Sequence, residues 1–81
     1  PAAVRLDAAE ADPKKEAERR VKLGRAAFAD GDYGRAAEHF AAATAADPAE
    51  PTTYFLHGQA HFAAGQYRDA VARIRDGLAR D

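Results

Sequence analysis

The sequence predicts an all-α protein that is built from two copies of one helical unit. Alanine, the strongest helix former, makes up 23 of the 81 residues, whereas the β-branched residues Val and Ile together number only four. A shift of the chain by 34 residues brings residues 23–37 onto residues 57–71. Within each copy, mostly apolar or small residues recur at intervals of three and four, as they do on one face of a helix. These observations predict a helical repeat.

The repeat rests on matched residues in a single register. Nine identities occur among the 31 aligned positions. The matched pairs are Gly24/Gly58, Ala26/Ala60, Phe28/Phe62, Ala29/Ala63, Gly31/Gly65, Tyr33/Tyr67, Ala36/Ala70, Ala45/Ala79 and Asp47/Asp81. An alanine-rich chain gives some alanine matches by chance, but it does not give Gly, Phe and Tyr matches at the same offset. We therefore expect one repeat over residues 13–48 and a second over residues 49–81.

The first unit is predicted to form two helices. One face of the first helix carries Arg20, Leu23, Gly24 and Ala27. Gly31 suits the left-handed residue that ends a helix, and Asp32 suits the cap of the next one. The packing face of the second helix carries Ala36, Ala37, Phe40 and Ala43. Pro48 ends that helix, because the residue before a proline disfavours the helical conformation.

The second unit repeats the same plan. Pro51 suits the first turn of a helix, whose packing face carries Tyr54, His57, Gly58 and His61. A turn at residues 65–67 leads to a last helix, whose apolar face carries Ala70, Val71, Ile74 and Leu78. Gly24 and Gly58 are predicted to mark the closest approach of paired helices, because a residue without a side chain lets two helix axes come nearest.

The two ends of the chain give different expectations. Residues 9–13 (AEADP) resemble residues 44–48 (TAADP), so residues 1–12 are expected to be the end of an earlier helix, a short lead-in helix or a partly ordered extension. No polar capping helix follows the last helix, so Val71, Ile74 and Leu78 should be partly exposed. Because repeats bury their core by stacking, this predicts a piece of a longer array or self-association through the last helix.

Composition excludes several classes of function. The chain has no Cys, and its formal net charge is −1 with both signs mixed. No disulfide framework or thiolate metal site is expected, and neither nucleic acid nor an anionic membrane attracts such a chain. No apolar run approaches the roughly 20 residues of a membrane span, and the first residues lack the apolar core of a secretory signal. We therefore expect a cytoplasmic protein that does not bind membranes.

His57 and His61 lie four residues apart, a spacing at which two imidazoles on one helix can bind a metal ion. A helical metalloprotease site needs Glu directly after the first His, but Gly58 stands there, and a metal site needs a third ligand. Both histidines fall on the packing face, which explains their spacing. The sequence therefore predicts no metal, no cofactor and no catalytic residues, and it predicts pH-sensitive stability, since a buried imidazole resists protonation.

The chain resembles the tetratricopeptide repeat family, whose repeat is 34 residues long and follows the pattern W-x2-L-G-x2-Y…A-x3-F…P. The first unit matches this pattern at Leu23, Gly24, Ala36, Phe40 and Pro48. Arg20 and Ala27 replace its Trp and Tyr. The second unit matches at Gly58 and Ala70, whereas Tyr54, His57, His61 and Ile74 replace Trp, Leu, Tyr and Phe. The resemblance covers residues 17–81 and implies a solenoid of helix–turn–helix units.

In the resembled family, the first helix of each repeat lines a concave groove that binds a peptide or a helix. Carried over residue by residue, this groove takes Glu18, Val21, Lys22, Arg25, Phe28 and Ala29 from the first unit, and Thr52, Phe55, Leu56, Gln59, Phe62 and Ala63 from the second. We expect partner contacts at Val21, Lys22, Arg25, Phe28, Phe55, Gln59 and Phe62. The aromatic residues among them are candidate anchors, or else they pack against a neighbouring repeat.

The charge of this groove points to the kind of ligand. Lys22 and Arg25 give it one basic edge, which favours an apolar peptide that carries an acidic residue. One subclass of the resembled family clamps a C-terminal carboxylate with Lys and Asn. Here Val21 and Arg25 stand at the first Lys and Asn positions, and the chain has no Asn, so that clamp is absent in its usual form.

The predicted function is non-enzymatic binding of another protein, as a scaffold module within a larger protein. The alternative is a structural unit that self-associates through its last helix. A remote alternative is nucleic-acid binding through Lys14, Lys15, Arg19, Arg20, Lys22 and Arg25. Glu16 and Glu18 interrupt that basic run and are spaced to pair with it along one helix, which disfavours this alternative.

Overall fold

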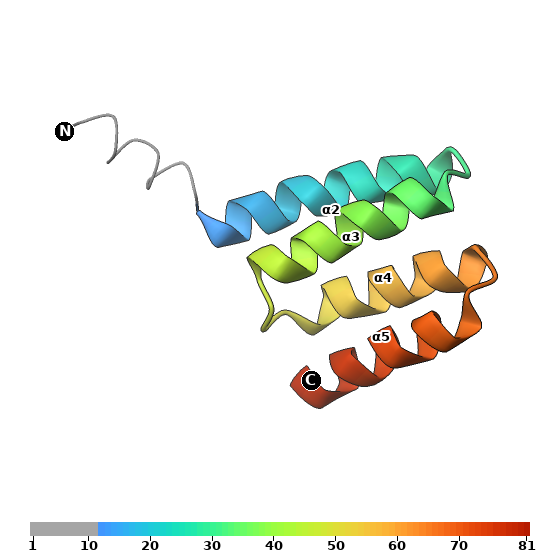
Figure 1. Ribbon diagram of the computed structural model, residues 1–81. Helices are drawn as coiled ribbons and strands as arrows, with labels where there is room; N and C mark the ends of the chain where they lie inside the picture. The colour runs from blue at the N-terminus through green and yellow to red at the C-terminus, as the bar shows by residue number, and fades with distance from the viewer. Residues whose placement is uncertain (1–11) are drawn as a thin grey trace.

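The computed structural model describes residues 12–81 as four helices joined by short turns. The helices are α2 (Pro13–Ala29), α3 (Tyr33–Ala46), α4 (Pro51–Ala63) and α5 (Tyr67–Arg80). Successive helices run antiparallel and lie side by side in chain order (Figure 1). Residues 12–81 contain no strand, so the predicted all-α helical repeat is confirmed. The predicted N-terminal extension lies outside the described residues, apart from Asp12.

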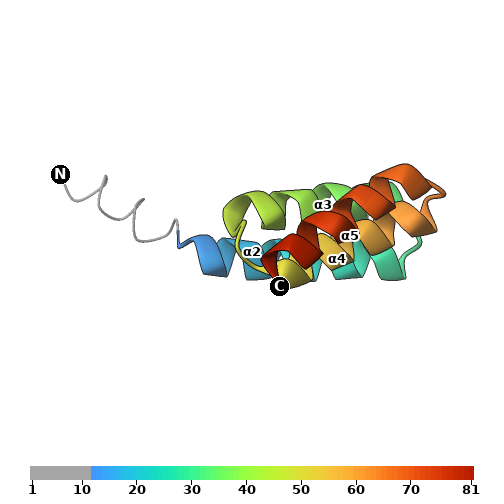
Figure 2. The same ribbon diagram turned by 90° about the horizontal axis from the view of Figure 1, so that it is seen from below.

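The helices form two layers. Seen from below, α3 lies on one side of α2, and α5 crosses in front of α4 at an angle, with its first turns toward the side of α3 (Figure 2). The closest packing is within each repeat, between α2 and α3 and between α4 and α5, and then between repeats, where α3 meets α4. The first helices of the two repeats therefore share one face of the molecule.

Carboxylate side chains cap the N-termini of three of the four described helices. Asp12, Asp32 and Glu50 accept hydrogen bonds from backbone N–H groups in the first turns of α2, α3 and α4, at 3.0, 3.1 and 3.3 Å. Pro13 and Pro51 occupy the first positions of α2 and α4, where a backbone N–H has no partner within the helix. The sequence therefore fixes where these helices begin.

The two turns within the repeats have the same backbone geometry. Gly31 and Gly65 have φ values of 80° and 79°, the left-handed conformation that a side chain disfavours. In each turn, the N–H after the glycine donates to the carbonyl oxygen five residues earlier, at 2.9 and 2.8 Å. This pattern is a common helix ending, and it confirms the predicted role of Gly31 and the predicted turn at residues 65–67.

Glycine marks the closest contacts between paired helices, as predicted. A Cβ on Gly24 would lie 2.5 Å from Cε1 of Phe40, and a Cβ on Gly58 would lie 2.9 Å from Cγ1 of Ile74. These two pairs are related by the 34-residue shift. Because real Cβ atoms essentially never approach another atom this closely, a larger residue at either glycine would force the facing side chain or the helices of that repeat to shift.

The core is made mostly of alanines around one aromatic ring. Phe40 is almost fully buried, and it clusters with Ala27, Ala36, Ala37 and Ala60. Because Ala60 belongs to α4, this core runs continuously from the first repeat into the second.

The inter-repeat contact also includes a hydrogen bond, because the Thr44 hydroxyl on α3 donates to Thr53 Oγ1 on α4 at 3.3 Å. Leu23 departs from its expected place on the packing face: it is 39% exposed, because the α2–α3 contact is centred on its neighbour Gly24.

Candidate functional site

A hollow of about 540 Å³ lies between the first helices of the two repeats. It is lined by Lys14, Ala17, Glu18, Val21, Lys22 and Arg25 from α2 and by Asp47, Glu50, Thr52, Thr53 and Leu56 from α4 and the connection before it. A second hollow of about 220 Å³ shares Arg25 and Leu56 with the first, and it adds Phe28, Ala29, Phe40 and Gln59. We refer to the two hollows together as the α2–α4 groove.

The α2–α4 groove has an apolar floor. Val21 and Leu56 are half-buried, and both pack against the core cluster around Phe40. Phe28 packs against the same cluster and also lies against Tyr33, with the ring centroids 5.0 Å apart. Rigid apolar side chains backed by the core give a ligand a firm surface to bury.

The two edges of the groove carry opposite charges. Lys14, Lys22 and Arg25 make the α2 edge mainly basic, with Glu18 among them. Asp47 and Glu50, which lie in the connection before α4, make the other edge acidic. The basic edge was predicted from the sequence. The acidic edge was not, because its residues belong to the α3–α4 connection rather than to the face of a first helix.

Contacts from α4 and α5 hold the acidic edge in place. The Tyr54 hydroxyl and Nε of Arg80 both donate to the carbonyl oxygen of Pro48, each at 2.8 Å. The Arg80 guanidinium also lies over the Tyr54 ring, 4.4 Å from its centroid. These contacts join the end of the last helix to the connection that carries Asp47 and Glu50.

The groove brings together five of the seven residues that were predicted to bind a partner. Val21, Lys22, Arg25, Phe28 and Gln59 all line it.

Phe55 and Phe62 line neither hollow. Phe62 is 63% exposed and lies against Tyr67 at the α4–α5 turn, with centroids 5.1 Å apart. This pair is the counterpart of Phe28 and Tyr33, which occupy the α2–α3 turn.

Phe55 packs within its own repeat. A Cβ on Gly77 of α5 would lie 2.6 Å from Cε1 of Phe55, so the ring lies against the bare backbone of that glycine. In the first repeat, the counterparts of this pair are Val21 and Ala43. A larger residue on α4 is thus matched by a smaller one on α5. The aligned repeats show this reciprocal change in size. It could have indicated from the sequence that Phe55 packs against Gly77.

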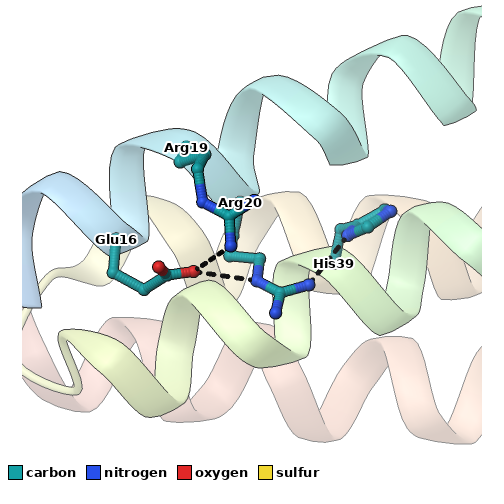
Figure 3. Close-up of polar contacts among 4 residues, drawn as sticks. All are labelled: Glu16, Arg19, Arg20 and His39. Carbon is teal, nitrogen blue, oxygen red and sulfur yellow. Dashed lines mark hydrogen bonds and ion pairs between the residues drawn. The ribbon is translucent and has the colours of Figure 1, made fainter. Parts of the chain in front are cut away.

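The basic run of α2 is divided by an acidic residue (Figure 3). Oε1 of Glu16 accepts hydrogen bonds from Arg19 at 2.8 Å and from Arg20 at 3.0 Å, and Arg20 also lies 3.5 Å from Nδ1 of His39. The hydrogen bonds from Arg19 and then Arg20 lower the pKa of Glu16. These two arginines are locally paired, so the remaining cations of α2 do not form one continuous basic surface.

The two histidines of α4 form a short polar chain. Nε2 of His57 lies 2.9 Å from Nε2 of His61, and Nδ1 of His61 lies 2.7 Å from Oε1 of Gln66. His57 is only 9% exposed, whereas His61 is half-buried. Burial, followed by the charges of His61 and Arg73, lowers the pKa of His57 to about 4, against a smaller opposing effect of Asp69.

This arrangement gives the histidine pair a structural role in the packing between α4 and α5. His57 lies on the buried face, as predicted, and His61 lies at its margin. Within residues 12–81, no three His, Asp or Glu side chains gather where they could hold a metal ion. His57 is buried in the packing of α4, and His61 is hydrogen-bonded to Gln66 just before α5.

Comparison with known proteins adds to this geometry. A family model described as tetratricopeptide repeat matches residues 27–81, which span the end of α2 and all of α3, α4 and α5. The chain belongs to the tetratricopeptide repeat family. Tetratricopeptide repeats generally mediate protein–protein interactions and are typically non-enzymatic. A comparison with curated proteins found no match.

The hydropathy of the helices completes this description. None of the four tetratricopeptide repeat helices in the described part of the chain is both long and apolar enough to cross a membrane.

Proposed function

We propose that this chain is a non-enzymatic interaction module that holds a segment of a partner protein in the α2–α4 groove. The observation that carries the proposal is the groove itself, a hollow of about 540 Å³ between the first helices, with an apolar floor and oppositely charged edges. The membership of the chain in an interaction family supports the same assignment.

The groove favours a ligand with both apolar and charged residues. Apolar side chains would lie on Val21, Phe28 and Leu56. An acidic residue would face Lys22 and Arg25, and complementary charge of this kind speeds binding and sets orientation. A basic residue near Asp47 or Glu50 would fix the direction in which the segment lies.

The aromatic residues divide into different roles in this proposal. Phe28 is the aromatic anchor, because it lines the groove and is backed by the core. Phe62 stays a predicted contact beyond the lined hollows. Phe55 supports the α4–α5 contact, so its substitution would act first on stability.

The test begins with peptides selected on the wild-type protein from a random display library. One selected peptide is measured by fluorescence anisotropy, and its contacts are mapped by amide chemical shifts. We expect the selected peptides to combine apolar and acidic residues and to shift amides along α2 and α4. Lys22→Glu/Arg25→Glu should weaken binding at least about tenfold, because a tenfold change requires only ~1.4 kcal/mol.

A matched control separates the groove from overall charge. Lys15→Glu/Arg35→Glu makes the same change in net charge at exposed positions that do not line the groove. It should bind within about twofold of wild type, since distant exposed charges are screened. Equal weakening by both double variants, or shifts that avoid α2 and α4, would contradict the proposal.

Self-association through α5 is the second candidate. The exposure of Val71, Ile74 and Leu78 favours it, because these apolar side chains face solvent in the single chain. Sedimentation over a range of concentrations tests it directly, since a dimer would appear as a mass that rises with concentration. A stable monomer would exclude it.

A further inference from the structure

The second, smaller hollow of the α2–α4 groove has the size of a single side chain. Its volume is about 220 Å³, less than half of the 540 Å³ of the first hollow. A cavity of about 150 Å³ lined by aliphatic and aromatic side chains holds a benzene molecule, so there is room here for one aromatic ring. We call this second hollow the small hollow. Both of its walls are described helices, α2 and α4, so it belongs to the contact between the two repeats.

The apolar lining of the small hollow is partly aromatic. Phe28 and Ala29 come from α2, Leu56 comes from α4, and the almost fully buried Phe40 comes from α3. Phe28 and Leu56 are half-buried and pack against the core, and Phe28 is also held by Tyr33 at an interplanar angle of 59°. Tilted aromatic pairs are more favourable than their buried area alone accounts for. A ring that enters the small hollow would meet Phe28 and add a second aromatic contact.

Two polar side chains complete the lining of the small hollow. Arg25 and Gln59 are exposed, and within residues 12–81 neither is paired with another side chain by an ion pair or a hydrogen bond. A guanidinium group attracts the face of an aromatic ring, and an amide group can both donate to and accept from a hydroxyl. An aliphatic side chain would use neither group. The polar lining therefore favours an aromatic ring that carries a hydroxyl.

The small hollow continues into the basic edge of the groove. Arg25 and Leu56 line both hollows, so a segment that places one side chain in the small hollow runs on into the first. There it passes Lys22, which is three residues and hence ~4.5 Å from Arg25 along α2. A carboxylate close in sequence to the ring would therefore lie beside a cation.

We propose that the small hollow binds a tyrosine side chain of the partner segment, with an acidic residue near that tyrosine in the partner sequence. The inference rests on the proposed function, and it names the residue that anchors the segment. The ring packs on Phe28 and Leu56 and against the guanidinium of Arg25. The hydroxyl is hydrogen-bonded to the amide of Gln59, and the carboxylate pairs with Lys22. This anchor fixes the register of the segment along the groove.

The test uses four pentapeptides with blocked ends that differ only at the central residue. Each has the sequence Glu-Ala-X-Ala-Val, where X is Tyr, Phe, Leu or Ala, and each is titrated into the protein while amide chemical shifts are followed. The Tyr peptide should bind about threefold more tightly than the Phe peptide, the effect of one hydrogen bond. It should bind at least about fivefold more tightly than the Leu peptide and tenfold more tightly than the Ala peptide. The largest shifts should occur around Phe28, Ala29 and Gln59.

Two repeat-related alanines provide a matched pair of variants. Ala29→Leu places a larger side chain in the small hollow, whereas Ala63→Leu makes the same change at the counterpart in the second repeat, which lines none of the hollows described. Both alanines are exposed last residues of helices, so helicity by circular dichroism should be unchanged. Ala29→Leu should weaken binding of the Tyr peptide at least about tenfold, and Ala63→Leu should keep it within about twofold of wild type.

Gln59→Leu tests the hydrogen bond to the tyrosine hydroxyl. This substitution leaves the net charge unchanged and removes the amide from the small hollow. The affinities of the Tyr and Phe peptides should then lie within about twofold of each other, because the difference between them rests on that one bond.

Several results would overturn the inference. Equal binding of the Tyr and Leu peptides would remove the role of the ring, and equal binding of the Tyr and Phe peptides would remove the assignment to tyrosine. No binding of the Tyr peptide, or equal weakening by Ala29→Leu and Ala63→Leu, would remove the small hollow as the site. The proposed function is judged separately. A library peptide that is weakened by Lys22→Glu/Arg25→Glu but not by Ala29→Leu would support the groove and refute the tyrosine anchor.

Discussion

At the scale of single residues, His57 shows how a polar group is accommodated in a small core. His61 can donate from Nδ1 to Gln66 while its Nε2 accepts from Nε2 of His57. Nδ1 of His57 is buried and has no hydrogen-bond partner among the described residues. A protonated His57 would have to donate from that atom too. The neutral form is therefore strongly favoured in the folded state.

The lowered pKa makes stability depend on pH. The folded pKa of about 4 lies below the ordinary 6.5, so the stabilising contribution is complete above pH 6.5 and is lost as the pH falls toward 4. The loss is at most about 3.5 kcal/mol, because the pKa of His57 falls from 6.5 to about 4 and each pKa unit corresponds to about 1.4 kcal/mol. The urea concentration at the midpoint of unfolding should therefore be lower at pH 5 than at pH 7.5. His57→Leu should remove most of this change, and His39→Gln should retain it.

An equal midpoint at both values of pH would contradict this explanation of His57. The range above pH 5 is chosen because carboxylates such as Glu16, whose pKa is lowered further by its arginines, titrate mainly below it.

The sequence placed His57 on the packing face but did not identify its partner. Helical spacing fixes the direction in which a residue points, and His57 is indeed buried. The hydrogen-bonded series from His57 through His61 to Gln66 depends on side-chain conformations across a turn. Helical spacing does not determine these conformations. The same limit explains why Leu23, one residue from the closest contact, is more exposed than its place in the pattern predicted.

At the scale of helices, each repeat is held together by glycines that face large side chains. Gly24 faces Phe40 in the first repeat, whereas the second repeat uses Gly58 with Ile74 and Gly77 with Phe55. Compared with the first repeat, the second repeat has the smaller Ile74 in place of Phe40 at one contact. It has the larger Phe55 in place of Val21 at the other. Its two contacts compensate for each other in volume.

Gly77→Ala should destabilise the protein although alanine favours helix formation. The propensity gain is about 1 kcal/mol, but the new Cβ would lie 2.6 Å from Phe55 and force the ring to move, at a cost of about 1–3 kcal/mol. Gly34→Ala is the matched control. It adds a Cβ to α3 with nothing within 4 Å, and it should raise the urea midpoint slightly.

Phe55→Val/Gly77→Ala tests whether the two residues act as a pair. This double variant recreates the Val21 and Ala43 pair of the first repeat. Its loss of stability should be smaller than the sum of the two single losses by about 1 kcal/mol, a coupling that adjacent residues commonly show. Simple additivity in a double-mutant cycle would contradict the compensation.

The helices were predictable to a large extent, whereas the groove was predictable only in part. The 34-residue shift and the Gly turns predicted four helices in the right places, because backbone conformation depends on nearby residues. Phe55 was different, since its direction depends on Gly77, which lies 22 residues further on. The acidic edge also depends on how a connection folds back beside α2, and no local pattern describes that.

At the scale of the whole molecule, the repeats are joined at two levels. Ala60 extends the core of the first repeat into the second. Arg80 then ties the end of α5 to Pro48, which lies 32 residues earlier in the connection between the repeats. The last helix is thus fixed to the middle of the chain as well as to α4.

Arg80→Ala should weaken the whole structure, even though Arg80 is exposed. It removes the hydrogen bond to Pro48 and the contact with the Tyr54 ring, and we expect a loss of about 1 kcal/mol in the free energy of unfolding. Arg68→Ala, on the same helix but without an ion pair in the described chain, should change the unfolding free energy little. Equal effects of the two substitutions in urea titrations would argue against the brace.

The shared carbonyl of Pro48 has a consequence for recognition. Two donors hold the segment between Asp47 and Glu50 in place in the free chain, so in the proposed complex that edge of the groove would not have to be ordered on binding. Association should then resemble the docking of two rigid bodies. Loss of the Arg80 contact should slow the binding of a ligand that contacts the acidic edge of the α2–α4 groove. It should not change the binding of a ligand that contacts only the basic edge.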